Sequence, residues 1–182
     1  MGSGAGNGFS IRPDWSTYAL LIDWAQEDEA RTFFENDNYF SDYLGRSENF
    51  AHIYMTPFQT HGSWGQGNPW ADNLDEYQEG RMAVITRATI KPHLVPYFWT
   101  KVRNAADGIE DYPGHVYSKG IGEWPLFMQA TISMWESKDE MRRFAYESKQ
   151  HQKVMKLTRT KNWYKEDMFT EFNVLHIEGN LI

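Results

Sequence analysis

The chain lacks several features that would assign it to a familiar class of protein. It has no cysteine, which excludes disulfides, thiol nucleophiles and cysteine-ligated metal or haem centres. No apolar run approaches the roughly 18 residues of a membrane-spanning helix, and the N-terminus has no basic-then-apolar signal pattern. The net charge of −7 argues against nucleic acid as a partner. Together these absences predict a cytoplasmic protein with no transmembrane segment.

Aromatic residues, in contrast, are abundant. The 182 residues include 29 aromatic side chains (8 Trp, 10 Tyr and 11 Phe). Such rings fill cores and also line ligand pockets. Composition alone favours core packing. The length suits one domain of ordinary size or two small halves that share a core.

The pattern of apolar residues predicts an α+β fold. Strands end at prolines and glycines, whereas helices show apolar residues at three- and four-residue spacing. We expect strands at 17–24, 50–58, 82–90, 116–121, 127–135 and 172–177, and helices at 26–44, 94–106 and 137–158. From residue 82 onward the order is β-α-β-β-α-β, which is the ferredoxin-like unit.

An internal repeat relates the two halves of the chain. Five identities recur at an offset of 111 residues, in Trp24-x-x-x-Asp28-Glu29-x-Arg31-x-Phe33 and Trp135-x-x-x-Asp139-Glu140-x-Arg142-x-Phe144. We interpret this as a duplication. The sequence therefore predicts tandem ferredoxin-like repeats: an incomplete half at 1–60, a linker loop at 61–80 and a complete half at 81–182.

The same offset predicts that the first half lacks its initial strand and helix. The counterparts of 82–106 would fall before Met1. An incomplete sheet leaves an unpaired edge, which proteins rarely tolerate. We therefore expect a homodimer, other edge-strand pairing, or a chain that belongs to a longer protein.

Among six histidines, His151 has the most informative position. No His-x-x-x-His or His-Glu-x-x-His spacing occurs, which argues against a zinc site made by protein ligands alone. His151 lies on the predicted core-facing stripe of the helix at 137–158, and the repeat matches it with Phe40. The other members of that stripe are Met141, Phe144, Ser148, Met155 and Thr158.

Two interpretations of His151 remain open from the residues alone. It is either a core histidine bonded to a neighbour, or the single proximal ligand of a haem held among Met and Phe side chains. Three further polar residues are candidates for a pocket. Glu123 and Gln129 come from adjacent strands, and Arg87 could face carboxylates such as haem propionates. Their alternative role is a surface or intra-core ion pair.

An ordered set of motifs resembles the spheroidene monooxygenase family, the haem-containing enzymes of bacterial carotenoid biosynthesis. The resemblance covers nearly the whole chain, from the glycine-rich start to Trp163-Tyr164-x-Glu166. It is carried by Gly2-Ser3-Gly4-x-Gly6-x-Gly8-Phe9, Thr86-Arg87-Ala88-Thr89-Ile90-Lys91-Pro92, Phe98-Trp99, Gly120-Ile121-Gly122-Glu123-x-Pro125-Leu126 and Gln129-x-Thr131-x-Ser133-x-Trp135. Family members carry a further strand and helix before the glycine-rich motif, which this sequence lacks.

The resemblance implies an oxidoreductase of the dimeric α/β-barrel type. His151 would bind the iron of haem b, with Phe144, Ser148, Met155 and Arg87 around the cofactor. Gln129 or Arg87 would manage bound oxygen, and an external electron donor and O2 would be needed. The expected partner is a small apolar, carotenoid-like substrate, with peripheral membrane contact. The alternatives are a haem-dependent dehydratase and a haem-degrading or haem-binding barrel without oxygenase activity.

Overall fold

The computed structural model describes residues 2–4, 12–102, 108–124 and 126–181. The elements of the first half are β1 (Gly2–Gly4), β2 (Pro13–Tyr18), α1 (Glu27–Asn36), α2 (Asn38–Leu44) and β3 (Ala51–Gly62). Those of the second half are β4 (Met82–Ile90), the 3-10 turn η1 (Pro92–Leu94), α3 (Val95–Val102), β5 (His115–Trp124), β6 (Met128–Trp135), α4 (Lys138–Glu147), α5 (Lys149–Lys161) and β7 (Tyr164–Gly179).

One seven-stranded antiparallel sheet connects both halves, in the order β2-β1-β5-β6-β4-β7-β3. Within it the second half forms β5-β6-β4-β7, the strand order of a ferredoxin-like unit. The predicted α+β, ferredoxin-like fold is therefore confirmed. The boundaries at 1–60, 61–80 and 81–182 remain a prediction, because the sheet crosses them.

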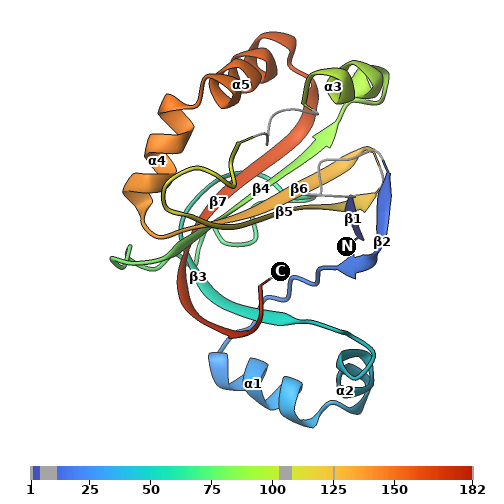
Figure 1. Cartoon of the computed structure of the whole chain (residues 1–182), viewed down its shortest axis with the longest axis vertical. Coiled ribbons are helices and arrows are strands. Elements are labelled where there is room, and N and C mark those ends of the chain that lie inside the picture. The colour runs from blue at the N-terminus through green and yellow to red at the C-terminus, as the bar shows by residue number, and fades with distance from the viewer. Residues whose placement is uncertain (1, 5–11, 103–107, 125, 182) are drawn as a thin grey trace.

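The sheet separates two cores. Side chains alternate between the faces of a strand, so on β4 Ala83 and Ile85 contribute to one cluster, with Met134, Met168 and Phe172. We call this side the inner face. Met82 and Val84 point the other way, toward Trp135, Met141 and Phe144. We call that side the helix face, since α4 packs there. Helices α3, α4 and α5 lie at one end of the molecule, and α1 and α2 at the other (Figure 1).

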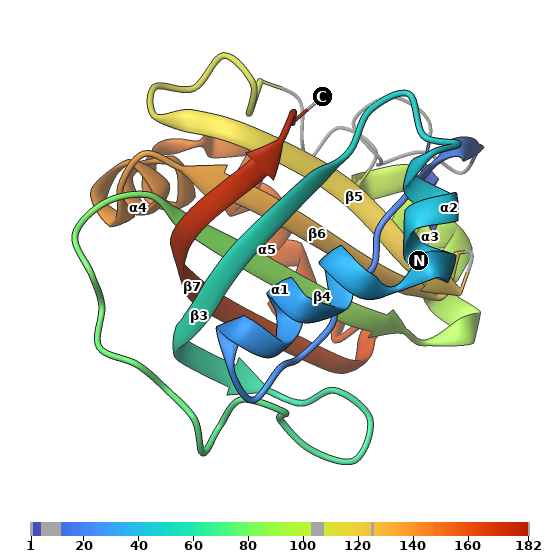
Figure 2. The same ribbon diagram turned by 90° about the horizontal axis from the view of Figure 1, so that it is seen from below.

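The last strands of the two halves pair with each other. β3 and β7 run antiparallel side by side (Figure 2), from Ala51 opposite Gly179 to Gly62 opposite Met168. Near the Gly62 end of this ladder the hydroxyls of Thr60 and Thr170 lie 2.6 Å apart. At the end of β3, Gly62 has a φ of +85°, and a Cβ there would collide with the Asp167 carbonyl oxygen. This close approach requires glycine.

The structure reproduces the repeat in detail. Subtracting 111 from the bounds of α4, residues 138–147, gives 27–36, which are the bounds of α1. Residues Asp37 and Ser148, which are also 111 apart, interrupt both helical segments in the same way. Each has extended backbone angles, and its side chain accepts a hydrogen bond from the third residue of the next helix.

These interruptions correct two predictions. Single helices at 26–44 and 137–158 were expected, and both predictions are wrong, because Asp37 and Ser148 end one helix and cap the next. Ser and Asp compete with helical hydrogen bonding through their own side chains, which favours caps over helix interiors. The apolar periodicity continues across the break and therefore hides it.

The predicted strands also change length. A strand at 17–24 is wrong in its second part: β2 ends at Tyr18, and residues 19–24 lie outside the strands of the described chain. Leu21 instead packs against the inner-face cluster. β3 continues past Pro57 with a register irregularity there, and β7 begins at Tyr164, well before the predicted 172. The helix expected at 94–106 is described only as far as Val102.

Candidate functional site

His151 lies in the first turn of α5, directly after the break between α4 and α5. Its backbone N–H donates to Ser148 Oγ at 3.3 Å, so the serine caps the helix that carries the histidine. The ring of Phe144, in the last turn of α4, lies 5.1 Å from the imidazole centre. The break therefore turns His151 back toward the helix that packs on the sheet.

His151 belongs to a larger assembly of rings on the helix face. Phe144 packs on Trp135 of β6 at 5.1 Å, and Tyr112 meets Phe144 edge-on at 5.2 Å. His115, the first residue of β5, contacts Trp135 at 5.3 Å. We call Tyr112, His115, Trp135, Phe144 and His151 the second-half ring cluster. It brings two imidazoles to one apolar region.

Burial disfavours the charged form of both imidazoles of this cluster. It lowers the pKa of His151 below its ordinary value. Burial also lowers the pKa of His115, against a smaller opposing effect of Glu110. The Nε2 atom of His115 is buried and has no hydrogen-bond partner within the described ranges. A neutral imidazole has the free lone pair that a metal ligand needs.

The predicted cofactor residues on the helices lie close together in sequence and space. Ser148 precedes His151 by three residues and contacts its backbone, while Met155 follows one helical turn later and is half-buried. Phe144 is almost fully buried. His115 was not predicted. Its place opposite Trp135 depends on the register between β5 and β6, for which the sequence carries no signal.

Arg87 lies on the other side of the sheet. Its neighbours Ala83 and Ile85, at the same alternation, belong to the inner-face cluster. The guanidinium donates to Glu123 at 3.2 and 3.3 Å and to Glu166 at 2.7 Å. It also lies over the ring of Trp64 at 5.2 Å. Only 2% of the side chain is exposed. The structure does not bring Arg87 together with His151, and its donors are occupied by two carboxylates.

Gln129 shares the helix face but lies far along its strand. It pairs with Ala88 and Gly122, and its side-chain amide lies beside Gly122. Six residues separate it from Trp135, which corresponds to about 20 Å along a strand. The predicted pair of Gln129 and Arg87 is therefore divided by the sheet.

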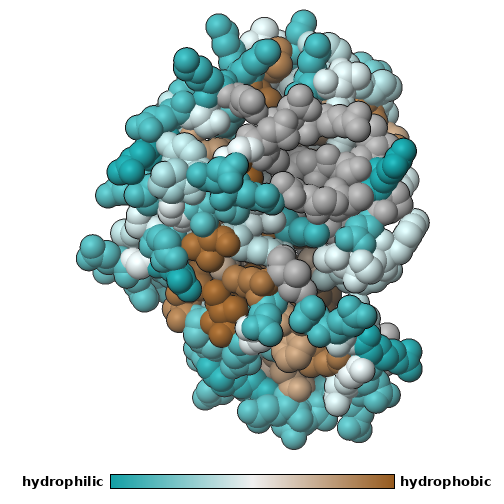
Figure 3. Space-filling model, in the orientation of Figure 1, coloured by the Kyte–Doolittle hydropathy of each residue, from teal (hydrophilic) through white to brown (hydrophobic). Residues whose placement is uncertain are grey.

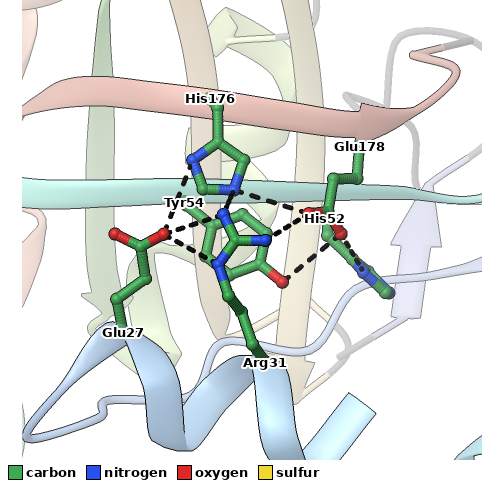
Figure 4. Close-up of polar contacts among 6 residues, drawn as sticks. All are labelled: Glu27, Arg31, His52, Tyr54, His176 and Glu178. Carbon is green, nitrogen blue, oxygen red and sulfur yellow. Dashed lines mark hydrogen bonds and ion pairs between the residues drawn. The ribbon is translucent and has the colours of Figure 1, made fainter. Parts of the chain in front are cut away.

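A group of polar side chains in mutual contact joins α1 to β3 and β7 (Figure 4). Arg31 donates to Glu27 at 2.8 Å, to Glu178 at 3.1 Å and to His176 Nε2 at 2.8 Å. Its guanidinium lies 5.2 Å from the ring of Tyr54, on which His176 stacks. Sequence reasoning missed this group, because its members come from three elements that meet only in the fold.

Comparison with known proteins bears on these arrangements. No protein-family model matches the chain. A spheroidene monooxygenase of Rhodobacter capsulatus is 29% identical over 181 residues, which cover 98% of this chain and 75% of that protein. Spheroidene monooxygenases of Cereibacter sphaeroides and Rubrivivax gelatinosus are 27% and 28% identical, over 98% of this chain and 56% and 68% of their own lengths. The chain is similar to spheroidene monooxygenases.

This similarity confirms the resemblance predicted from the motifs, and with it the class of the chain as an oxidoreductase. A solved structure from Fusobacterium nucleatum, provisionally named a monooxygenase, has a TM-score of 0.50 at 13% identity. It covers 86% of this chain and 69% of that chain, and it shows a shared fold.

The names of these relatives state no cofactor. Within the described residues no three His, Asp or Glu side chains are grouped to hold a metal ion. A single imidazole beside apolar rings, as His151 is beside Phe144, is the kind of protein ligand that haem iron takes.

Among the described residues, none of the helices has both the length and the apolar content of a membrane-spanning segment.

Proposed function

We propose that the chain is a haem-dependent monooxygenase that oxidises an apolar, carotenoid-like substrate in the cytoplasm, with His151 as the iron ligand. The observation that carries the proposal is the position of His151 in the first turn of α5, where its imidazole packs on Phe144 and burial lowers its pKa. The names of the three relatives supply the reaction class.

The roles of the surrounding residues follow from their contacts. Ser148 anchors the backbone of His151 through the helix cap, and Phe144 packs against the imidazole. Met155, one turn further along α5, offers an apolar side chain on the same side. Arg87 is left out of this arrangement, since its guanidinium already pairs with Glu123 and Glu166 on the inner face.

Bound haem would supply the redox chemistry, in which one oxygen atom of O2 enters the substrate and the other leaves as water, with two electrons from an external donor and two protons. The chain itself contributes apolar rings from which water is excluded. Trp135 and Phe144 are buried there, and His115 places a second imidazole beside Trp135. The unpaired Nε2 of that imidazole is able to accept a proton.

Exposed apolar surface supports a lipophilic substrate. Trp15, Leu20 and Trp124 are at least 63% exposed. On the face drawn in Figure 3, apolar side chains gather between the sheet and the α1–α2 pair. Exposed apolar patches of this kind mark contact with membranes, partners or ligands. Peripheral contact with a membrane that dissolves the substrate is part of the proposal.

A haem titration tests the cofactor assignment. The purified chain should take up haem with a Soret band, and His151→Ala should abolish or shift that band. His93→Ala is the matched control, because His93 is an exposed residue of η1, and it should bind haem like the wild type. Absence of a Soret band in the wild type, or an unchanged band in His151→Ala, would overturn the assignment.

Product analysis tests the reaction. The haem-loaded chain is supplied separately with a carotenoid and with an aldoxime, each with reductant and O2. Mass spectrometry should find the carotenoid with one added oxygen atom and the aldoxime unchanged. Conversion of the aldoxime to a nitrile would establish the dehydratase alternative, and loss of haem itself would establish haem degradation.

A further inference from the structure

The first half contains its own cluster of aromatic side chains, between α1, α2 and the start of β3. Five of its rings form contacts at centroid distances of 4.7 to 6.5 Å, and Phe50 joins them through its contact with His52. We call it the first-half ring cluster; its members are Trp24, Phe33, Phe34, Phe40, Tyr43 and Phe50. Unlike the second-half cluster it is partly open, since Tyr43 is 47% and Phe50 43% exposed.

His52 places one polar atom among these rings. Its imidazole stacks on Phe34 at 4.3 Å and lies 5.3 Å from Phe50 and 5.7 Å from Phe40. The side chain is only 15% exposed. Its Nε2 atom is buried and has no hydrogen-bond partner within the described ranges. A buried polar atom without a partner costs roughly 1–3 kcal/mol, so this position calls for an explanation.

The other ring nitrogen of His52 faces a carboxylate. Glu178 Oε2 lies 3.7 Å from Nδ1 and 3.4 Å from the hydroxyl of Tyr54, which donates to it. The second oxygen of Glu178 accepts from Arg31 at 3.1 Å, so the carboxylate is held in place (Figure 4). A carboxylate on the Nδ1 side favours the tautomer with its proton on Nδ1. Nε2 then presents a bare lone pair to the first-half ring cluster.

We propose that His52 and the first-half ring cluster form a second binding site, for an unsaturated apolar molecule that carries a hydroxyl group. Ring faces suit flat, conjugated carbon chains, and the lone pair of His52 Nε2 suits a hydroxyl donor. Tyr43 and Phe50, whose rings are partly exposed, form the side of the site that faces solvent. The ligand hydroxyl satisfies the atom that the protein leaves unpaired.

This site is separate from His151. The α1–α2 pair lies at the opposite end of the molecule from α4 and α5 (Figure 1). In the repeat, Phe40 of α2 occupies the position equivalent to His151, so the helix of the first half has no histidine there. The imidazole of the first-half cluster belongs instead to His52 of strand β3. Binding at His52 does not depend on haem, so the proposal stands or falls independently of the proposed function.

The experiment compares two fluorescent polyenes that differ in the hydroxyl group. All-trans-retinol and retinyl acetate are titrated separately into the full chain, and binding is followed by polyene fluorescence. We expect retinol to bind roughly tenfold more tightly, the effect of one buried hydrogen bond. Equal affinity of the two probes, or no binding of either, would overturn the proposal without any variant being needed.

Variants then locate the hydroxyl. His52→Phe keeps a ring and removes the acceptor, so it should bind both probes with the weaker affinity. His52→Gln offers an amide oxygen and should restore part of the preference for retinol. His93→Phe is the matched control, because His93 is an exposed residue of η1 outside both ring clusters, and it should keep the full preference. A preference that survives in His52→Phe, or is lost in His93→Phe, contradicts the site, whereas a haem titration reports on His151 alone.

Discussion

The two halves of the molecule repeat the same ring contacts with very different burial. Trp24 contacts Phe33 at 5.3 Å, and their counterparts Trp135 and Phe144 lie 5.1 Å apart. The next contact links Phe33 to Phe40 and Phe144 to His151. Yet Trp135 and Phe144 are buried, whereas in α1 only Ala30 is.

The difference comes from the strands beside each tryptophan. Trp135 ends β6, which pairs with both β4 and β5. Trp24 lies outside the strands of the described chain. The same local pattern therefore gives a closed core where flanking strands extend the sheet, and a half-open cluster where they do not. The half-open first-half cluster allows a ligand to enter, whereas the closed second-half cluster buries the imidazole of His151 and lowers its pKa.

A parallel contrast holds for two arginines. Arg87 and Arg31 each pair with two glutamates and lie 5.2 Å from an aromatic ring. Arg87 is almost fully buried, whereas the Arg31 side chain is 40% exposed. Water screens the ion pairs of Arg31 but not those of Arg87. The same number of ion pairs therefore contributes differently to the free energy of unfolding.

Replacement of the paired tryptophans is the strongest test of the comparison. Trp135→Ala should lower the free energy of unfolding by about 3–5 kcal/mol, as expected for a large buried ring. Trp24→Ala should cost about 1–2 kcal/mol, because that ring is only half-buried. Urea unfolding followed by circular dichroism measures both. Equal costs would show that the two ring clusters are packed alike.

Removal of the paired arginines should give the next largest contrast. Arg87→Met leaves Glu123 and Glu166 near one another without a cation, and we expect a loss of about 3 kcal/mol in unfolding free energy. Arg31→Met should change stability far less. As a control, Arg87→Met combined with Glu123→Gln and Glu166→Gln should recover part of the loss. A triple variant as unstable as Arg87→Met would contradict this account.

The two helix caps should show nearly equal effects. Asp37 accepts from Phe40 N–H at 2.7 Å, and Ser148 accepts from His151 N–H at 3.3 Å. Asp37→Ala and Ser148→Ala should each cost about 1 kcal/mol, and glycine at either position should cost only a few tenths. Unfolding curves of the four variants check this. An alanine variant as stable as the wild type would show that its cap bond does not form in solution.

Replacement of His151 by phenylalanine, the residue at the equivalent position Phe40 of the first half, should have a smaller effect. The change should be seen mainly in how the free energy of unfolding depends on pH. Burial lowers the pKa of folded His151 below its ordinary 6.5, so between the two values the unfolded chain binds more protons. Wild-type stability should therefore fall as the pH drops below about 6.5. His151→Phe should lose part of this slope, and His115, whose pKa is lowered in the same direction, should keep the rest. An unchanged slope would mean that His151 is accessible to water in the folded chain.

Local patterns predicted much of the fold. The order of the second-half elements and the internal repeat could be seen from apolar spacing and five identities, because these depend on short-range periodicity. The breaks at Asp37 and Ser148 were missed, although both residues are frequent helix caps. Apolar residues continue at helical spacing on either side, so periodicity outweighed the signal of a single polar residue.

The candidate site was predicted less completely. His151, Phe144 and Ser148 lie within one helical segment, and helical spacing sufficed to group them. Arg87 and Gln129, one or the other of which was expected to manage bound oxygen, lie on opposite faces of the sheet, and the face of a strand residue follows only from the alternation of the whole sheet. His52 and His115 were missed, since each becomes notable only when the surrounding elements leave its Nε2 buried and unpaired.

The α+β class, the duplication and the histidine that stands where the first half has phenylalanine could all be seen in the amino-acid sequence, because each is carried by residue identities and spacings within short segments. The closed state of one ring cluster, the burial of Arg87 and the unpaired histidine nitrogens became visible only in the folded chain. Burial and pairing depend on strands far apart in sequence, and their register is established only when the whole sheet forms.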